Sequence, residues 1–176
     1  MTNSARSDFP GMVNNRQRRI AGTQIGVISD THGLLRPEAI EALTGSDLIL
    51  HAGDIGKPEI LEELSTIAPV VAVRGNNDTG DWARTIPESE TISVENVSIH
   101  LLHIAKDLRL DPKRAGVQVV ISGHSHKPSL EEREGILFLN PGSAGPRRFK
   151  LPISVACLYV KDNTVNAQVV DLLKSN

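Results

Sequence analysis

The chain of 176 residues is poor in cysteine and in aromatic side chains, with one Cys, three Phe, one Tyr and one Trp. A single cysteine, Cys157, excludes an intrachain disulfide. It also excludes zinc fingers and iron–sulfur clusters, because these are held by several cysteines. Any metal ion bound by this chain is therefore held by His, Asp and Asn side chains.

The chain also lacks an excess of charge of one sign and a long apolar run. Its 19 Lys and Arg residues nearly balance 21 Asp and Glu residues. Without a broad basic surface or many aromatic residues, a dedicated nucleic-acid-binding protein is disfavoured. No apolar run is long enough to cross a bilayer, and no signal peptide is recognisable at the N-terminus. We therefore expect a cytoplasmic protein without membrane contacts.

Two regions differ in composition. Residues 1–22 are polar and carry Arg16, Arg18 and Arg19, so we expect a flexible N-terminal extension. Residues 23–176 show no linker and no internal repeat, and we expect a single domain there.

The pattern from Thr23 onward predicts an α/β fold, because short apolar runs alternate with helical segments. Strands at 23–29, 47–51 and 69–74, separated by helices at 36–43 and 58–66, have the order of parallel βαβ units. The remainder is richer in strands, which we expect at 90–94, 97–102, 117–122, 135–139, 153–160 and 165–172, with one helix at 106–115. So many strands favour two packed sheets with flanking helices.

Five of the predicted strands end in side chains that commonly bind metal ions. These side chains are, in chain order, Asp30 and His32, Asp54, Asn76, His103, and His124 and His126. The carboxyl ends of parallel strands open onto the crevice in which ligands bind, so these seven residues are expected to converge.

The residue types in this set suit divalent ions of intermediate hardness, namely Mn²⁺, Fe²⁺, Co²⁺, Ni²⁺ or Zn²⁺. Seven ligands are too many for one ion. If Asp54 bridged two ions, the other six would divide into three for each. Each residue alone has an ordinary alternative role as a turn residue, helix cap or polar contact. Their joint pattern at successive strand ends favours the two-metal site.

The chain resembles the calcineurin-like metallophosphoesterases, and within them the small prokaryotic phosphodiesterases related to the retromer scaffold subunit. The motifs that carry this resemblance are Asp30-Thr31-His32, Gly53-Asp54, Gly75-Asn76-Asn77-Asp78, His103, Gly123-His124-Ser125-His126 and Asn140-Pro141-Gly142-Ser143. The resemblance extends from about Gln24 to the C-terminus. It implies a four-layer αββα sandwich of two mixed β-sheets.

The resemblance also implies two metal sites. One ion would be bound by Asp30, His32, Asp54 and His126, and the other by Asp54, Asn76, His103 and His124. All seven would be catalytic through the two divalent ions, with Mn²⁺ expected first and Fe²⁺, Zn²⁺, Ni²⁺ or Co²⁺ as alternatives. Asp78 would orient a metal ligand, and Arg147 would contact the substrate phosphate. For both, an ordinary surface position or a structural ion pair is an equal alternative.

These features predict a phosphodiesterase in which a hydroxide bridging two ions attacks phosphorus. The substrate would be a small phosphate ester. Three alternatives stay open, namely a phosphomonoesterase, a cyclic-nucleotide phosphodiesterase, and a non-catalytic interaction scaffold of the same fold. The oligomeric state also stays open, with a homo-oligomer as one option.

Two positions depart from the family pattern. Ile104 stands where relatives usually have Gly after the metal-binding His, and a β-branched residue does not easily adopt the backbone angles that Gly allows. Asn77 stands where other branches place a His as general acid, and an amide cannot protonate a leaving group. We therefore expect esters with good leaving groups to react best. His51 and His100 are expected to make structural polar contacts.

Overall fold

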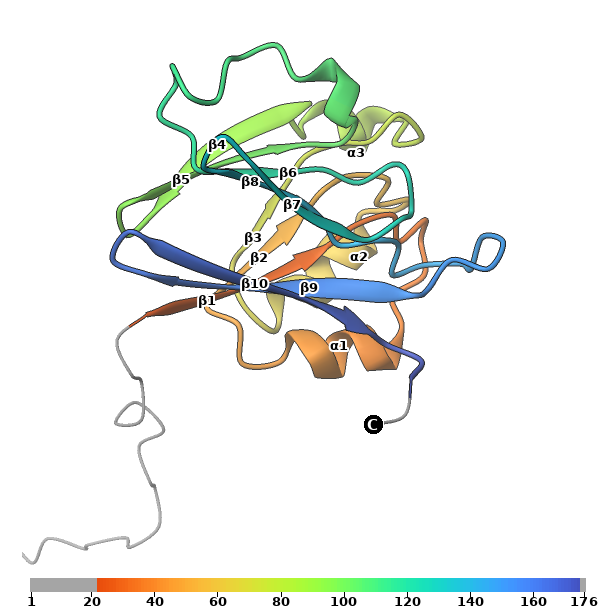
Figure 1. Cartoon of the computed structure of the whole chain (residues 1–176). Coiled ribbons are helices and arrows are strands. Elements are labelled where there is room, and N and C mark those ends of the chain that lie inside the picture. The colour runs from red at the N-terminus through yellow and green to blue at the C-terminus, as the bar shows by residue number, and fades with distance from the viewer. Residues whose placement is uncertain (1–21, 175–176) are drawn as a thin grey trace, which may run out of the picture.

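Two five-stranded sheets stack face to face in the computed structural model, which describes residues 22–174 (Figure 1). The first sheet has the order β10-β9-β1-β2-β3. Its strands are β1 (Thr23–Ile28), β2 (Leu48–His51), β3 (Val70–Ala72), β9 (Ser154–Lys161) and β10 (Thr164–Asp171). Strands β1, β2 and β3 are parallel, as the βαβ pattern predicts, whereas β9 runs antiparallel to both β1 and β10.

The second sheet has the order β4-β5-β6-β8-β7. Its strands are β4 (Ser89–Val94), β5 (Val97–Leu102), β6 (Val119–Ile121), β7 (Ser129–Arg133) and β8 (Ile136–Asn140). The three central strands β5, β6 and β8 are parallel, and the edge strands β4 and β7 are antiparallel to their neighbours. Both sheets are therefore mixed, as expected.

Alternation of side chains along the strands builds the core between the sheets. Ile99 and Leu101 of β5 point inward and meet Val27 of β1 and Leu50 of β2, all of them fully buried. Burying a side chain of this size contributes about 1.5–3 kcal/mol. The core fixes the two sheets against each other and thereby fixes the relative positions of their strand ends.

The helices are short and lie mainly against the outer face of the first sheet. They are α1 (Pro37–Leu43), α2 (Glu59–Ser65) and α3 (Asp81–Arg84). Buried residues of α1 and α2, including Leu43 and Leu64, pack with Ile28 and Ile49. Within residues 22–174 no helix is long and apolar enough to span a membrane.

The outer face of the second sheet is covered by a loop, the green segment at the top of Figure 1. The prediction of a helix at 106–115 is wrong, because only a 3₁₀ turn (Ala105–Asp107) forms there. Pro112 lacks an N–H and disfavours the helical conformation of Asp111 before it. Leu108 and Leu110 pack against Val120 and Phe138 without helical periodicity.

The other boundaries agree with the expected elements to within two residues at each end, and the expectation of two mixed sheets with helices is confirmed. Two short elements were not expected, strand β7 and helix α3. The edge strand β7 is mostly exposed and rich in charge, so it carries no apolar alternation. The N-terminal extension expected at 1–22 lies almost entirely outside the described residues.

Candidate metal centre

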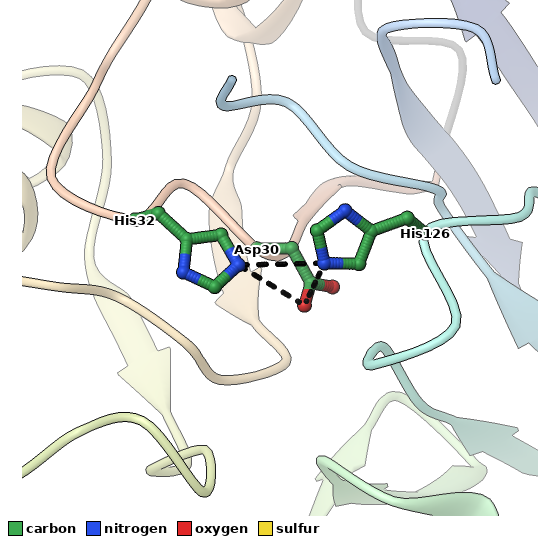
Figure 2. A group of neighbouring side chains, drawn as sticks. All are labelled: Asp30, His32 and His126. Atoms are coloured by element: carbon green, nitrogen blue, oxygen red, sulfur yellow. Dashed lines mark hydrogen bonds and ion pairs between the residues drawn. The ribbon is translucent and has the colours of Figure 1, made fainter. Parts of the chain in front are cut away.

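Asp30, His32 and His126 form a close group at the carboxyl ends of β1 and β6 (Figure 2). The Nε2 atoms of His32 and His126 are 3.3 Å apart. Asp30 Oδ1 lies 3.2 Å from His126 Nε2 and 3.9 Å from His32 Nε2. Three ligand atoms thus face one point, which is the arrangement that a bound cation requires.

Asp54 lies between this group and His103. Its Oδ2 is 3.7 Å from His32 Nε2 and 3.3 Å from His103 Nε2. Atoms of Asp30, Asp54 and His103 also lie within 4.8 Å of one another, forming a second group. Asp54 therefore contacts ligands on both sides, as a bridging carboxylate does.

Asn76 and His124 complete the set of seven residues. Asn76 Oδ1 lies 3.0 Å from His124 Nδ1, and both residues are exposed. The His124 ring meets the His103 ring edge to face, with centroids 5.2 Å apart. All seven sequence-predicted ligands are thus joined by a continuous series of contacts. The compact second group includes Asp30, whereas Asn76 and His124 stand at its outer side.

Hydrogen bonds between loops hold the two sheets together at this edge. The backbone N–H of His124 donates to Asp30 Oδ2 at 3.0 Å, joining β6 to β1. The Nδ1 of His103 lies 2.7 Å from the carbonyl oxygen of Ala52, joining β5 to β2. This contact makes Nδ1 the donor to Ala52 and directs Nε2 at Asp54. Burial acts to lower the pKa of His103, but Asp54 and the Ala52 contact outweigh it and raise that pKa.

The backbone is strained at five of the seven positions. Positive φ angles between 46° and 68° occur at Asp30, His32, Asp54, His124 and His126. Such conformations are uncommon for residues other than Gly and cost of order 1–3 kcal/mol each. Five of the nine positive-φ residues other than Gly in the described part of the chain therefore belong to this group.

Glycines leave room for the two aspartates. A Cβ at Gly75 would lie 2.1 Å from Asp54 Oδ1, and one at Gly123 would lie 2.7 Å from Asp30 Oδ2. The glycines of the sequence motifs are therefore required by close packing against carboxylates.

Buried polar atoms without hydrogen bonds indicate that the site accepts a cation. Within the described residues, Asp30 Oδ1, His103 Nε2 and His126 Nδ1 are buried and lack a hydrogen-bond partner. Asp30 Oδ1 and His103 Nε2 face neighbouring ligands at short distance without forming hydrogen bonds. Buried unsatisfied groups are costly, and ligation of divalent ions would satisfy Asp30 Oδ1 and His103 Nε2.

The two aspartates have opposite pKa shifts. Burial raises the pKa of Asp30 to about 6, against the opposing hydrogen bond from Ser29. Burial acts on Asp54 in the same direction, but the neighbouring His103 imidazole and the hydrogen bonds from Asn77 outweigh it and lower the Asp54 pKa. Asp54 is therefore an anion throughout the physiological pH range, which suits it to bind two cations.

Burial also lowers the pKa of His126, to about 4, and that of His32. The positive charge of Arg148 acts in the same direction on both rings. Neutral imidazole is the form that binds metal ions. These two rings are thus held in the ligating form.

His51 joins two of the ligand-bearing loops from beneath. Thr31 donates its hydroxyl proton to the carbonyl oxygen of Ile55, so it accepts from His51 Nε2 at 3.0 Å. The other nitrogen, Nδ1, accepts from the backbone N–H of Gly53 at 3.2 Å. Burial holds the ring neutral, with its pKa lowered to about 3. The expected structural role of His51 agrees with this network.

Asp78 organises backbone around Asp54 and Asn76. Its carboxylate accepts from the backbone N–H groups of Ile55, Gly56 and Gly75 at 2.8–3.1 Å. It thereby acts on the ligands through the main chain and does not bond to a ligand side chain.

Arg147 is engaged within the projecting loop 144–152, where its Nε donates to the carbonyl oxygen of Leu151 (Figure 1). Its neighbour Arg148, whose charge reaches His32 and His126, is the cation near the site. The dipeptide Arg147-Arg148 was visible in the sequence, but nothing in it showed which of the two faces the site.

The two departures from the family pattern have clear local structures. Ile104 has φ −107° and ψ 111°, ordinary extended angles that a β-branched residue adopts readily. Asn77 donates to Asp54 through its side chain at 2.7 Å and through its backbone at 2.9 Å. Asn77 thus fixes the carboxylate at the centre of the site.

Comparisons with known proteins agree with this geometry. Residues 24–163 match the calcineurin-like phosphoesterase superfamily domain. A probable metallophosphoesterase of Methanothermobacter thermautotrophicus is 39% identical over 158 residues, covering 83% of this chain and 91% of that protein. A phosphodiesterase of Methanocaldococcus jannaschii is 31% identical over 137 residues, covering 68% and 82%.

The fold is shared with a solved structure of Vacuolar Protein Sorting 29 from Cryptosporidium parvum. The TM-score is 0.70 at 22% identity, over 85% of this chain and 97% of that one. At this level of identity the similarity concerns the fold alone.

Proposed function

Because the chain belongs to the calcineurin-like phosphoesterase superfamily, we propose that it is a phosphodiesterase that depends on two divalent metal ions. The observation that carries the proposal is the convergence of seven ligand-type side chains from five strand ends. Within this set, the buried atoms Asp30 Oδ1 and His103 Nε2 lack hydrogen bonds, which is typical of atoms that bind a metal ion. The family itself implies hydrolysis of phosphoric esters, and the diester preference and the dinuclear centre are our proposal.

In this proposal each ion has its own ligands and the two share Asp54. Asp30, His32, Asp54 and His126 would hold one ion, and Asp54, Asn76, His103 and His124 the other. The close group of Asp30, His32 and His126 supports the first set. The contacts of His103 with Asp54 and His124, and of His124 with Asn76, support the second.

When bound, the ions would supply Lewis acidity toward a phosphoryl group and would lower the pKa of water near neutrality. The protein residues would do the rest. Asp54 stays ionised, Asn77 and His103 hold it in place, and Asp78 fixes the backbone beside it. Arg148 adds positive charge on the side of His32 and His126, which attracts an anionic ester.

The residues near Asp54 also bear on the choice of substrate. The Asn77 amide is committed to Asp54 and carries no titratable proton. We therefore propose that esters with good leaving groups react fastest. The mixed set of imidazole, carboxylate and amide ligands fits Mn²⁺, with Fe²⁺, Zn²⁺, Ni²⁺ and Co²⁺ as alternatives.

A non-catalytic interaction module is the second candidate, because the fold shared with Vacuolar Protein Sorting 29 defines an architecture and not an activity. The complete ligand set and its strained backbone argue for the enzyme, because a binding surface has no need of them.

The proposed function is tested by hydrolysis of bis(4-nitrophenyl) phosphate and of 4-nitrophenyl phosphate. Purified protein with Mn²⁺ should cleave the diester faster than the monoester, and excess chelator should abolish both reactions. Asp54→Ala should be inactive, and Arg147→Ala, which removes a guanidinium group bonded within its own loop, should retain activity. Inactivity of the metal-loaded wild type on both esters would favour the interaction module, and a preference for the monoester would favour a phosphomonoesterase.

A further inference from the structure

A cavity of about 570 Å³ opens beside the candidate metal centre and shares Asn76 and His103 with it. Cavities of this size hold small organic ligands. The cavity lies over the outer face of the second sheet, where the loop after His103 forms one wall with Ile104 and Leu110. Residues 104–110 thus form a loop that borders the cavity beside the candidate metal centre, in place of the expected helix at 106–115.

The floor of this cavity includes a histidine with a free nitrogen. On β5, Ile99 and Leu101 face the core between the sheets, so His100 and Leu102 face outward under the loop. His100 is 6% exposed, and its Nδ1 lies 2.7 Å from the Thr91 hydroxyl. Burial lowers the pKa of His100, so the ring is neutral. Among the described residues its Nε2 has no hydrogen-bond partner and remains for a ligand.

Two guanidinium groups border the cavity, those of Arg74 and Arg109. Arg74 is paired with Glu88 at 2.7 Å, but the Glu88 side chain is 80% exposed. Exposed pairs of this kind contribute little, so an incoming anion can replace Glu88. Arg109 acts on Glu88 only at longer range, and within residues 22–174 it forms no ion pair or hydrogen bond.

We propose that this cavity binds one arm of the substrate ester and selects an arm that carries a second anionic group, a phosphate or a carboxylate. Arg74 and Arg109 would bind this anion, His100 Nε2 would form a hydrogen bond with the arm, and Ile104 and Leu110 would contact its carbon skeleton. The inference rests on the proposed function, because Asn76 and His103 place the cavity next to the scissile phosphate.

The acidic residues of the cavity set the limits of this selection. The negative charges of Glu88 and Asp107 equal in number the positive charges of the two arginines. The alternative to the proposal is therefore a substrate arm that carries a positive charge. Glu88 is engaged with Arg74, so Arg109 and Asp107 are the two charged residues of the cavity lining without an ion pair in the described chain. Metal ions held by Asn76 and His103 under the proposed function would add positive charge beside the cavity, and this decides for an anionic arm.

The experiment compares two diesters that both release 4-nitrophenol. Thymidine 5′-(4-nitrophenyl phosphate) has an uncharged arm, and its 3′-phosphorylated form carries the second anion. Carboxymethyl and ethyl 4-nitrophenyl phosphate form the corresponding pair for a carboxylate. Wild-type kcat/KM should be higher for the anionic member of at least one pair. Whichever pair shows the preference identifies phosphate or carboxylate as the recognised group.

Arg109→Gln should reduce that preference roughly tenfold, the expected cost of one charged hydrogen bond. Arg114→Gln is the matched control, because Arg114 lies on the same loop, pairs with Asp111 and does not line the cavity. Equal kcat/KM within both pairs for the wild type, or an unchanged preference in Arg109→Gln, would overturn the proposal.

Titration calorimetry with thymidine 3′,5′-bisphosphate separates this inference from the proposed function. Mn²⁺-loaded wild type should bind it roughly tenfold more tightly than Arg109→Gln does. If this difference in affinity is found but no diester is hydrolysed, the proposed phosphodiesterase function is refuted and the cavity is still an anion site. If diesters are hydrolysed but both proteins bind the bisphosphate equally, the proposed function stands and the anion site is refuted.

Discussion

His32 and His126 direct their Nε2 atoms at each other across 3.3 Å, above the buried Oδ1 of Asp30. Burial holds both rings in the neutral form, so no charge repulsion separates them. This juxtaposition, formed by residues 94 positions apart in the chain, is the part of the candidate metal centre with the most compact geometry.

Removing one of these imidazoles should remove one of the two ions. His126→Ala should weaken one Mn²⁺ site by more than the roughly 10–100-fold that loss of a supporting residue costs. Isothermal titration with Mn²⁺ measures this, and Lys127→Ala, at the exposed neighbouring position, is the control. Unchanged affinity at both sites would contradict the assignment of His126.

Asn76→Ala should affect the other ion selectively. Its Oδ1 contacts His124, so the variant removes one ligand of the second set and leaves the group around Asp30 intact. Metal analysis after gel filtration should find about one ion fewer per chain. Equal loss of both ions would show that Asn76 does not belong to a single site.

Gly75→Ala should disturb both ions at once, because its Cβ would lie 2.1 Å from Asp54 Oδ1 and would displace the bridging carboxylate. Both the Mn²⁺ content and the hydrolysis of bis(4-nitrophenyl) phosphate should fall at least tenfold. Gly45→Ala is the control for a glycine replaced away from the centre, since open space surrounds it and only its φ of 90° is strained. Retained Mn²⁺ content in Gly75→Ala would show that Asp54 is not held as described.

Ile104→Gly should leave metal content unchanged, because the backbone at Ile104 already has angles open to every residue. The family pattern of Gly at this position predicts the opposite, a gain in metal affinity on restoring Gly. Titration with Mn²⁺ decides between them. A clear increase in affinity would show that Ile104 restricts the centre.

The buried His51 makes stability depend on pH. Its folded-state pKa of about 3 lies below the ordinary 6.5, so the unfolded chain binds the proton more readily. The contribution of the neutral His51 to the free energy of unfolding is therefore fully present above pH 6.5, and it is lost as the pH is lowered toward 3. At pH 5 the loss attributable to His51 is about 2 kcal/mol.

His51→Gln should be less stable than the wild type at pH 7.5, because the bonds to Thr31 and Gly53 are perturbed. It should lose less further stability than the wild type on going to pH 5, since Gln does not titrate. Urea unfolding at the two pH values, with chelator present, measures the difference. Equal pH dependence in both proteins would contradict a neutral buried ring.

Much of this architecture is predictable because local and global signals agree. The βαβ rhythm from Thr23 to Arg74 predicts three parallel strands, and polar residues at strand ends predict where ligands gather. The convergence of Asp30 with His126 further requires the packing of the two sheets, because β1 and β6 belong to different sheets. Positive φ at these residues is not readable from the sequence, because Asp and His carry no conformational signal as strong as that of Gly.

Other features depend on packing that a sequence does not display. Strand β7 has no apolar alternation, since its side chains face solvent at a sheet edge. Leu108 and Leu110 allow either a helix or a loop, and Pro112 together with packing on Phe138 decides for the loop. The sequence does not single out Arg109 as a binding residue, because the cavity that it lines is formed only by the folded loop.

Anomalous X-ray scattering from crystals grown with Mn²⁺ tests the two-ion centre most directly. The account predicts two peaks, one beside Asp30, His32 and His126 and the other beside Asn76, His103 and His124, with the Asp54 carboxylate in contact with both. A single peak, or none at these residues, would contradict the dinuclear centre on which the proposed phosphodiesterase depends.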